Sequence, residues 1–367
     1  MLFEPYQLKD LQLRNRLVMA PMTTYSSNED FTISEEELRY YHERSKTIGM
    51  VITAAVSIND SAQAFPRQIT IKSDDYIPSM KALADAIHEG GAKAVIQLHH
   101  GGRMNDPSLY EDKDLIVSAS AVKAPRDTLA TPKAMTEEEI YQTVDDFKAA
   151  VVRAIKAGFD GVELHGANTY LLQQFFSPHS NRRDDVFGGS VHKRMTFPLM
   201  LISAAREAID NYAQKPFILG YRFSPEELET PGITLEDTLK FVETLKDTKL
   251  DYLHVSLGHY RQTSIRNKDD EQLVVNKIQE VLNHEIPLIG VGGIETKKEA
   301  DDALSIGYDM IALGLGILVD PYIGETLKEE RIPEKHFLKR TQIPTLLYER
   351  LLKNKDRFME KGYTFEG

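Results

Sequence analysis

Apolar, strand-like runs alternate with helix-like segments along most of this 367-residue chain. Several runs are continuously apolar, as parallel strands are when helices cover both faces of their sheet. Residues 136–157 show the helix signals between the runs, because they open with a Thr-x-x-Glu capping box and stop at Gly158. Strands that alternate with helices in this way predict a (β/α)8 barrel, an α/β fold. The eight strand-like runs are residues 16–22, 50–56, 92–98, 159–164, 216–224, 250–256, 286–293 and 308–314. The other helix-like segments are residues 76–90, 234–246 and 296–306.

The domain organisation follows from the same pattern. We expect one barrel domain over residues 1–367, with a short N-terminal extension and a C-terminal helical extension over about residues 325–367. No low-complexity segment or Pro/Gly/Ser-rich linker divides the sequence. The alternative is a doubly wound open sheet. Such a sheet usually carries a G-x-G-x-x-G turn after its first strand when it binds a dinucleotide, and this sequence has none.

Composition excludes several classes of protein. The chain has no Cys, which rules out disulfides, thiolate catalysis and Cys-ligated zinc or iron–sulfur clusters. A net charge of −12 without a basic stripe argues against nucleic acid and anionic membrane surfaces. The N-terminus lacks the pattern of a signal peptide, and no apolar run approaches the roughly 20 residues that span a bilayer. We therefore expect a cytoplasmic protein that binds neither nucleic acid nor membrane.

Barrel active sites lie at the carboxyl ends of the strands. The strand end after run 159–164 offers several side chains that could take part in catalysis. Within six residues it offers the imidazole of His165, the carboxamide of Asn168 and the phenol of Tyr170. Two hydrogen-bond donors and a weak acid at one strand end are suited to polarising and protonating a carbonyl substrate.

The histidines of the sequence also suggest an alternative, a metal site. His99 and His100 end the third run. Adjacent residues on a strand point to opposite faces, so this pair cannot easily chelate one ion. With His165 as a third ligand, zinc would still need a carboxylate or water. We assign no metal.

Glycines end the last two runs, at Gly292-Gly293 and at Gly314, which Leu315 follows. Backbone N–H groups at this place form the usual phosphate site of a barrel. By itself the pattern predicts only a phosphorylated ligand.

Two longer motifs resemble those of a known family. The stretch that begins at His165 ends in SNRRDDVFGGSVHKRMTF, which matches S-N-x-R-x-D-x-[YF]-G-G-S-x-x-x-R-x-x-F almost position for position. Residues 15–22 read NRLVMAPM and look like an N-R-[LIV]-V-x-x-P-M core. With these motifs the chain resembles the old yellow enzyme family of FMN-dependent ene reductases, in its bacterial single-domain type. The SNRRDDVFGG motif looks like a self-pairing loop that supports the site.

The resemblance implies FMN as the cofactor and NADH or NADPH as the electron donor. Thr23 would tune the flavin potential, Gln97 would bond the pyrimidine edge, and Arg222 would stabilise negative charge on the reduced ring. The family's usual Gly-Arg after the last strand is Gly314-Leu315 here, so the arginine that normally neutralises the FMN phosphate is missing. The full set expected to bind the cofactor is Pro21, Met22, Thr23, Ala54, Gln97, Arg222, Gly292, Gly293, Gly314 and Leu315.

The same resemblance implies the reaction and its residues. The enzyme would reduce the activated C=C bond of small electrophilic alkenes, such as α,β-unsaturated carbonyl, nitro or quinone-type compounds. His165 and Asn168 would bind the substrate oxygen, and Tyr170 would protonate the substrate after hydride transfer from flavin N5. Tyr25 would line the substrate pocket. The sequence chooses neither between NADH and NADPH nor among these alkenes.

Two other functions stay open at this point. One is a barrel enzyme without flavin, although the sequence shows no strand-end Lys for a Schiff base and no carboxylate-rich metal cluster. The other is a non-catalytic protein that binds FMN or another phosphorylated ligand.

A segment near the C-terminus bears on the oligomeric state. Residues 344–350 faintly resemble a segment through which some bacterial relatives reach a neighbouring subunit with an arginine. On that hypothesis Arg350 acts across the interface of a homodimer. The alternative is an ordinary amphipathic helix.

Overall fold

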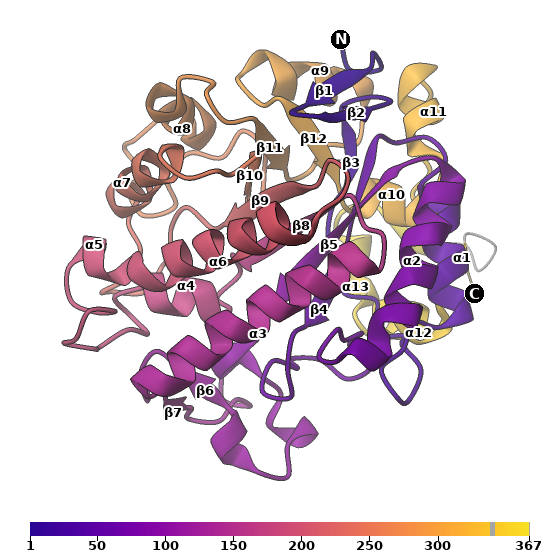
Figure 1. Cartoon of the computed structure of the whole chain (residues 1–367). Coiled ribbons are helices and arrows are strands. Elements are labelled where there is room, and N and C mark those ends of the chain that lie inside the picture. Colours follow the sequence, from indigo (N-terminus) through magenta and orange to yellow (C-terminus); the bar gives the residue numbers. More distant parts are fainter. Residues whose placement is uncertain (338–341, 367) are drawn as a thin grey trace.

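The computed structural model describes residues 1–337 and 342–366, and its centre is a closed barrel of eight parallel strands (Figure 1). The order around the barrel is β10-β11-β12-β3-β4-β5-β8-β9. Each strand overlaps one of the predicted runs, so the (β/α)8 prediction is confirmed. The barrel strands are β3 (Leu17–Met19), β4 (Met50–Ser57), β5 (Lys93–His99), β8 (Gly161–Gly166), β9 (Ile218–Phe223), β10 (Tyr252–Val255), β11 (Leu288–Val291) and β12 (Met310–Leu313).

Helices form a layer around the barrel, as Figure 1 shows for α2, α3 and α6. The capping box predicted at Thr136 is present, with its side chain accepting from the Glu139 amide at the start of α3. Two further capping boxes start α1 at Ser34 and α9 at Thr296. The larger helices are α1 (Glu35–Arg44), α2 (Ile77–Gly90), α3 (Glu137–Lys156), α6 (Thr196–Tyr212), α7 (Leu235–Lys246), α8 (Val274–Leu282) and α9 (Lys297–Ser305). The shorter ones are α4 (Leu171–Phe176), α5 (Val191–Arg194), α10 (Leu315–Val319) and α11 (Ile323–Lys328).

An N-terminal hairpin closes one end of the barrel. Its antiparallel strands are β1 (Tyr6–Leu8) and β2 (Leu11–Leu13). Leu8, Leu11 and Leu13 are buried in one apolar cluster with residues of the barrel interior, among them Val18 and Ile218. Because side chains fill this end, we expect a ligand to bind at the other end, where the strands terminate.

The segment after α11 packs back onto the first helix. It contains α12 (Thr345–Lys353), α13 (Lys355–Met359) and a small parallel sheet of β13 (His336–Phe337) and β14 (Thr364–Phe365). The Thr345 amide and hydroxyl at the start of α12 donate to the Glu36 carboxylate of α1 at 2.8 and 2.7 Å. These bonds fix α12 beside the site end of the barrel.

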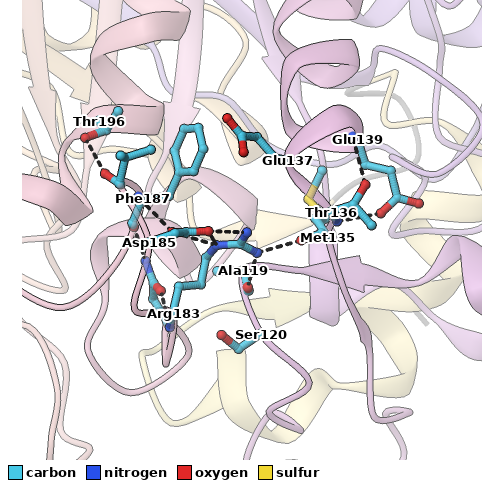
Figure 2. A network of polar contacts seen from close by, with 12 residues as sticks. Ala119, Ser120, Met135, Thr136, Glu137, Glu139, Arg183, Asp185, Phe187 and Thr196 are labelled. Carbon is cyan, nitrogen blue, oxygen red and sulfur yellow. Dashed lines mark hydrogen bonds and ion pairs between the residues drawn. The ribbon is translucent and has the colours of Figure 1, made fainter.

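The SNRRDDVFGG motif forms the self-pairing loop that the sequence predicts (Figure 2). Arg183 binds the Asp185 carboxylate with a shortest contact of 2.6 Å. The same guanidinium donates to the backbone oxygens of Ala119 and Met135 at 3.1 and 2.6 Å. Ala119 follows β6 (Val117–Ser118) and Met135 follows β7 (Lys133–Ala134). One arginine therefore ties the loop to the insertion between β5 and α3.

Candidate active site

The predicted cofactor-binding residues lie at or near the carboxyl ends of the strands. Pro21, Met22 and Thr23 follow β3, Ala54 lies in β4, Gln97 in β5, Arg222 in β9, Gly292 and Gly293 follow β11, and Gly314 and Leu315 follow β12. The barrel closure brings these separate segments to one end of the molecule.

The loop after β3 is anchored and strained. Thr24 is buried, and its hydroxyl donates to Glu37 Oε1 on α1 at 2.5 Å. Tyr25 has φ 55°, a left-handed conformation that costs a residue with a side chain about 1–3 kcal/mol. The anchored neighbour holds Tyr25 in that conformation. Its ring lies edge-on against Phe65, with the ring centres 5.6 Å apart.

Aromatic rings surround Tyr170. Its ring centre lies 4.4 Å from that of His99, 5.0 Å from that of His165 and 6.0 Å from that of Phe65. Phe65 in turn contacts Tyr25, so Tyr25, His165 and Tyr170 belong to one cluster of rings. Sequence reasoning missed Phe65 because it belongs to the long connection between β4 and α2, with no motif around it.

His165 is placed to donate from one defined nitrogen. Its Nδ1 accepts from the Ala167 backbone N–H at 3.4 Å, so Nε2 carries the proton. The side chain is buried, and desolvation lowers the pKa of His165 well below its ordinary value, with His99 and Arg222 adding to this effect. The imidazole is therefore neutral at physiological pH, with an N–H that can bond a substrate oxygen.

Two serines orient Asn168. The Asn168 backbone has φ 57° and donates its N–H to Ser224 Oγ at 2.9 Å. Its side-chain Oδ1 accepts from Ser256 Oγ at 2.9 Å, and Ser256 accepts in turn from Arg222 at 3.2 Å. Since Oδ1 is occupied, the NH2 group of Asn168 is the part left to bind a substrate. Sequence reasoning assigned no role to Ser224 or Ser256, although both directly follow adjacent strands, β9 and β10.

Tyr170 keeps its proton. Burial raises the pKa of Tyr170 and the neighbouring Tyr25 raises it further, while Arg126 and Arg222 lower it. The net shift is upward, so the phenol is the acid form at neutral pH. A protonated phenol beside the His165 imidazole is suited to deliver a proton to a substrate whose oxygen that imidazole binds.

A buried polar network lies beneath these residues, inside the barrel. Glu163 has no exposed side-chain surface, accepts from Gln97 Nε2 at 2.7 Å and pairs with His254 Nδ1 at 3.0 Å. Burial raises the pKa of Glu163, but His254, Arg222 and Gln97 outweigh it, and the net pKa is lowered. An ionised carboxylate therefore faces Arg222 inside the barrel. In the sequence, the feature that indicates this buried network is a Glu within the apolar run 159–164.

The residues present fit a flavin. Gln97 gives its NH2 group to Glu163, and its Oε1 has no hydrogen-bond partner among the residues that the structure describes, so it can accept from a ring N–H. Arg222 Nε is buried without a hydrogen-bond partner in residues 1–337 and 342–366, so it can donate to a ring carbonyl. Alternate donors and acceptors suit the pyrimidine edge of the ring. Ala54 lies where the β4–β5 register shifts, and its small side chain leaves room for a flat group.

Gly292 and Gly293 form an open backbone turn. Their φ values are 123° and 68°, which favour glycine. Their amides have no acceptor among the residues that the structure describes. At Gly314 an added Cβ would meet only Met22 Sδ, at 4.0 Å. The turn and Gly314 therefore leave space and free donors for an anionic group.

The two adjacent histidines bind different partners. His99 Nδ1 contacts Gln68 Nε2 at 3.1 Å, whereas His100 Nε2 contacts Ser61 Oγ at 3.0 Å. Within residues 1–337 and 342–366, no group of three or more His, Cys, Asp or Glu side chains is placed to hold a metal ion. No helix of that part of the chain is long and apolar enough to cross a bilayer.

Arg350 lies against its own chain in this structure, and its role across the interface of a homodimer stays a prediction. Arg350 contacts Tyr25 of the same chain, because α12 is docked on α1. A cavity of about 470 Å³ lies beside this contact, and Met22, Thr23 and Arg357 are among its lining residues.

Comparisons with known proteins agree with this geometry. A model of the NADH:flavin oxidoreductase / NADH oxidase family matches residues 1–334. The chain is 45% identical over 338 residues to the "Probable NADH-dependent flavin oxidoreductase YqiG" of Bacillus subtilis, covering 90% of this chain and 88% of the relative. It is 42% identical over 346 residues to the NADH:acrylate oxidoreductase of Vibrio harveyi, covering 92% of this chain but only 34% of that longer protein. The structure of morphinone reductase superposes with a TM-score of 0.79 at 26% identity, covering 93% of this chain and 92% of that one.

Proposed function

The chain belongs to the NADH:flavin oxidoreductase / NADH oxidase family, the old yellow enzyme family, and we propose that it uses FMN to reduce activated C=C bonds. Membership makes it an NAD(P)H-dependent flavin oxidoreductase. The finer reaction is the proposal. It rests on one observation: a neutral imidazole with a free Nε2–H and a protonated phenol lie with ring centres 5.0 Å apart.

Different residues of the chain bind the substrate oxygen and supply the proton. When bound, FMN supplies hydride chemistry, taking a hydride from NADH or NADPH and giving it to an electron-poor carbon. His165 Nε2 and the Asn168 NH2 group donate to the substrate carbonyl oxygen and stabilise the negative charge that develops there. Tyr170 then gives its phenolic proton to the α-carbon. Each role uses a proton that the surrounding hydrogen bonds or burial hold in place.

Cofactor binding is assigned to the strand ends. Gln97 and Arg222 would bond the pyrimidine edge, Thr23 would face the flavin carbonyl edge, and Ala54 would leave room for the ring. Gly292 and Gly293 would hold the phosphate with their free amides. Pro21, Met22, Gly314 and Leu315 complete the expected set.

The substrate class includes carbonyl-activated alkenes and extends to acids. The Vibrio harveyi relative is named for acrylate, an α,β-unsaturated carboxylate, but the present chain spans about a third of its length. An enone such as 2-cyclohexenone and acrylate are therefore the two substrates to compare.

Visible absorption of the purified protein tests this proposal. We expect a flavin spectrum that bleaches with NADH or NADPH under anaerobic conditions and returns when the enone is added. Bleaching without recovery by any electrophilic alkene would reject ene reduction and leave NAD(P)H oxidation alone. A colourless protein that takes up no added FMN would reject the flavoenzyme itself and return the chain to an unassigned phosphate-binding barrel.

A further inference from the structure

The phosphate end of the proposed FMN site lacks the expected cation. Leu315 stands where the family's arginine is expected, and its side chain packs against the apolar core. The amides of Gly292 and Gly293 can bond an anion, but they carry no full charge. A phosphate with about −1.5 to −2 charges favours a cationic or strongly polarised donor beside such amides.

The loop after β10 lies directly on this glycine turn. The Tyr260 N–H donates to the Gly292 carbonyl at 2.9 Å. A Cβ placed on Gly292 would come within 2.8 Å of His259 Cα and N, so only glycine permits this approach. A Cβ placed on Gly293 would lie 3.3 Å from His259 Cδ2 and 3.8 Å from Nε2. The imidazole edge that carries Nε2 therefore borders the space that Gly293 leaves open.

Local contacts decide which nitrogen of His259 donates. Nδ1 accepts from the Arg261 backbone N–H at 3.1 Å, so a neutral ring must carry its proton on Nε2. A protonated ring would donate from Nε2 as well. The ring stacks on Tyr260, with centres 4.9 Å apart and planes inclined by 24°, which fixes its orientation. Nε2 has no hydrogen-bond partner in the described part of the chain.

Two cations of the surrounding segments are committed elsewhere. Arg261 pairs with Asp302 at 2.6 Å, and Lys335 pairs with Glu295 at 2.7 Å. His259 forms no ion pair with any residue that the structure describes. His259 is thus a basic side chain beside the turn whose Nε2 is available to donate.

One carboxylate lies close to His259. Glu299 of α9 accepts from the backbone N–H groups of Glu295 and Thr296, both at 2.9 Å. Burial raises the pKa of Glu299, but these bonds and the nearby His259 imidazole lower it overall. The Glu299 carboxylate is therefore occupied by backbone donors at the start of α9.

We propose that His259 replaces the missing arginine and donates from Nε2 to the phosphate of bound FMN, beside the amides of Gly292 and Gly293. This inference rests on the proposed function, because it assumes that the ligand of the site is FMN. It assigns a binding role to the loop after β10, and it explains how Leu315 is tolerated.

Equilibrium binding of two flavins tests the role without using turnover. FMN and riboflavin differ only in the phosphate, so their dissociation constants separate the phosphate contact from the ring contacts. For apoprotein with His259→Ala we expect FMN binding about tenfold weaker, while riboflavin binding stays within about twofold of the unchanged protein. His192→Ala, at an exposed position of helix α5, is the matched control and should change neither constant.

Two more variants keep the test decisive if the alanine variant folds poorly. His259→Gln keeps an N–H donor near the Nε2 position and should lose less FMN affinity than His259→Ala. Adding Leu315→Arg to His259→Ala should restore FMN affinity, because it returns a cation to the position where the family's arginine is expected.

The contrary outcomes are distinct. Equal losses for FMN and riboflavin, or no loss for either, would overturn the His259 assignment and leave the proposed function standing. An unchanged protein that binds neither flavin would instead overturn the proposed function, and the inference with it.

Discussion

The guanidinium of Arg350 lies over the ring of Tyr25 in the same chain, with Cζ 3.9 Å from the ring centre. Burial raises the pKa of Tyr25, while the charge and hydrogen bond of Arg350 oppose that rise. Helix α12 carries Arg350 there because Thr345 fixes its start to Glu36. The C-terminal segment therefore brings a cation of its own chain to the substrate side. A homodimer stays a prediction, but this contact does not need one.

Replacing Arg350 by alanine should weaken substrate binding more than it slows chemistry. The variant loses a cation–π contact of about 0.5–1 kcal/mol and the support of Tyr25, whose backbone is strained. We expect KM for the enone to rise about two- to fivefold, with kcat within about twofold. Steady-state kinetics at saturating NADH or NADPH measure both constants.

Lys353→Ala is the control, because Lys353 is exposed on the same helix and should not affect KM. Mixing Arg350→Ala with Tyr170→Phe protein checks that the contact lies within one chain. If Arg350 served a neighbouring subunit, mixed dimers would regain a site with both side chains. Recovery of the original KM and activity on mixing would contradict the intrachain contact.

Tyr170→Phe should slow only the half of the reaction that needs a proton. Removing a general acid costs typically about 10²- to 10⁴-fold, so reoxidation of the flavin by the enone should fall by that order. Flavin reduction by NADH or NADPH should stay unchanged, since the phenol has no part in it. Stopped-flow absorption measures the two steps separately. A large loss in both would point to a disturbed pocket instead.

The neutral state of His165 predicts the shape of the pH profile. Desolvation by burial is the first cause that lowers the pKa of His165 well below its ordinary value. The imidazole therefore stays neutral as pH falls through about 6.5, where an unperturbed histidine takes up a proton. We expect kcat/KM for the enone to show no acid limb from this residue between about pH 6 and 8. A His165-dependent limb near pH 6.5 that disappears in His165→Asn would contradict the neutral assignment.

The sequence predicted the fold and the strand ends far better than the contacts between side chains at those strand ends. An apolar run is a local property of the sequence, and each of the eight runs overlaps a barrel strand. Ser256 bonds Asn168 across 88 positions of sequence, and neither residue's neighbours reveal the pair. The place of His259 beside Gly293 depends on how two loops meet in space, which no motif of the sequence encodes. The intrachain place of Arg350 likewise depends on the docking of α12, which no motif encodes.

Ser256→Ala tests whether the Asn168 carboxamide needs its long-range partner. Without the Ser256 hydroxyl, Asn168 Oδ1 loses its donor and the NH2 group is free to turn away from the substrate. The loss of one such bond is about 1 kcal/mol, so kcat/KM for the enone should fall about fivefold to tenfold. Ser305→Ala, at the far end of α9, is the control. An unchanged kcat/KM in Ser256→Ala would show that Asn168 is oriented by its backbone alone.

Glu163→Gln should lower the free energy of unfolding, because it removes the negative charge from the buried polar network. The variant keeps a side chain that can bond Gln97 and His254 but leaves Arg222 without its buried negative partner. Breaking a buried pair from one side costs about 3–5 kcal/mol, and urea unfolding at pH 7 should report a loss of that order.

The stabilising effect of the Glu163 charge depends on pH. The pKa of Glu163 is lowered in the folded protein, because His254, Arg222 and Gln97 outweigh the upward effect of burial. A depressed carboxyl pKa stabilises the fold above the unfolded value of about 4.3 and loses that effect as pH falls through the folded pKa. The gap in unfolding free energy between the unchanged protein and Glu163→Gln should therefore be constant from about pH 5 to 8 and narrow below about pH 4. A gap that instead widened on acidification would mean that Glu163 is protonated in the folded barrel, and Arg222 would then need another counter-charge.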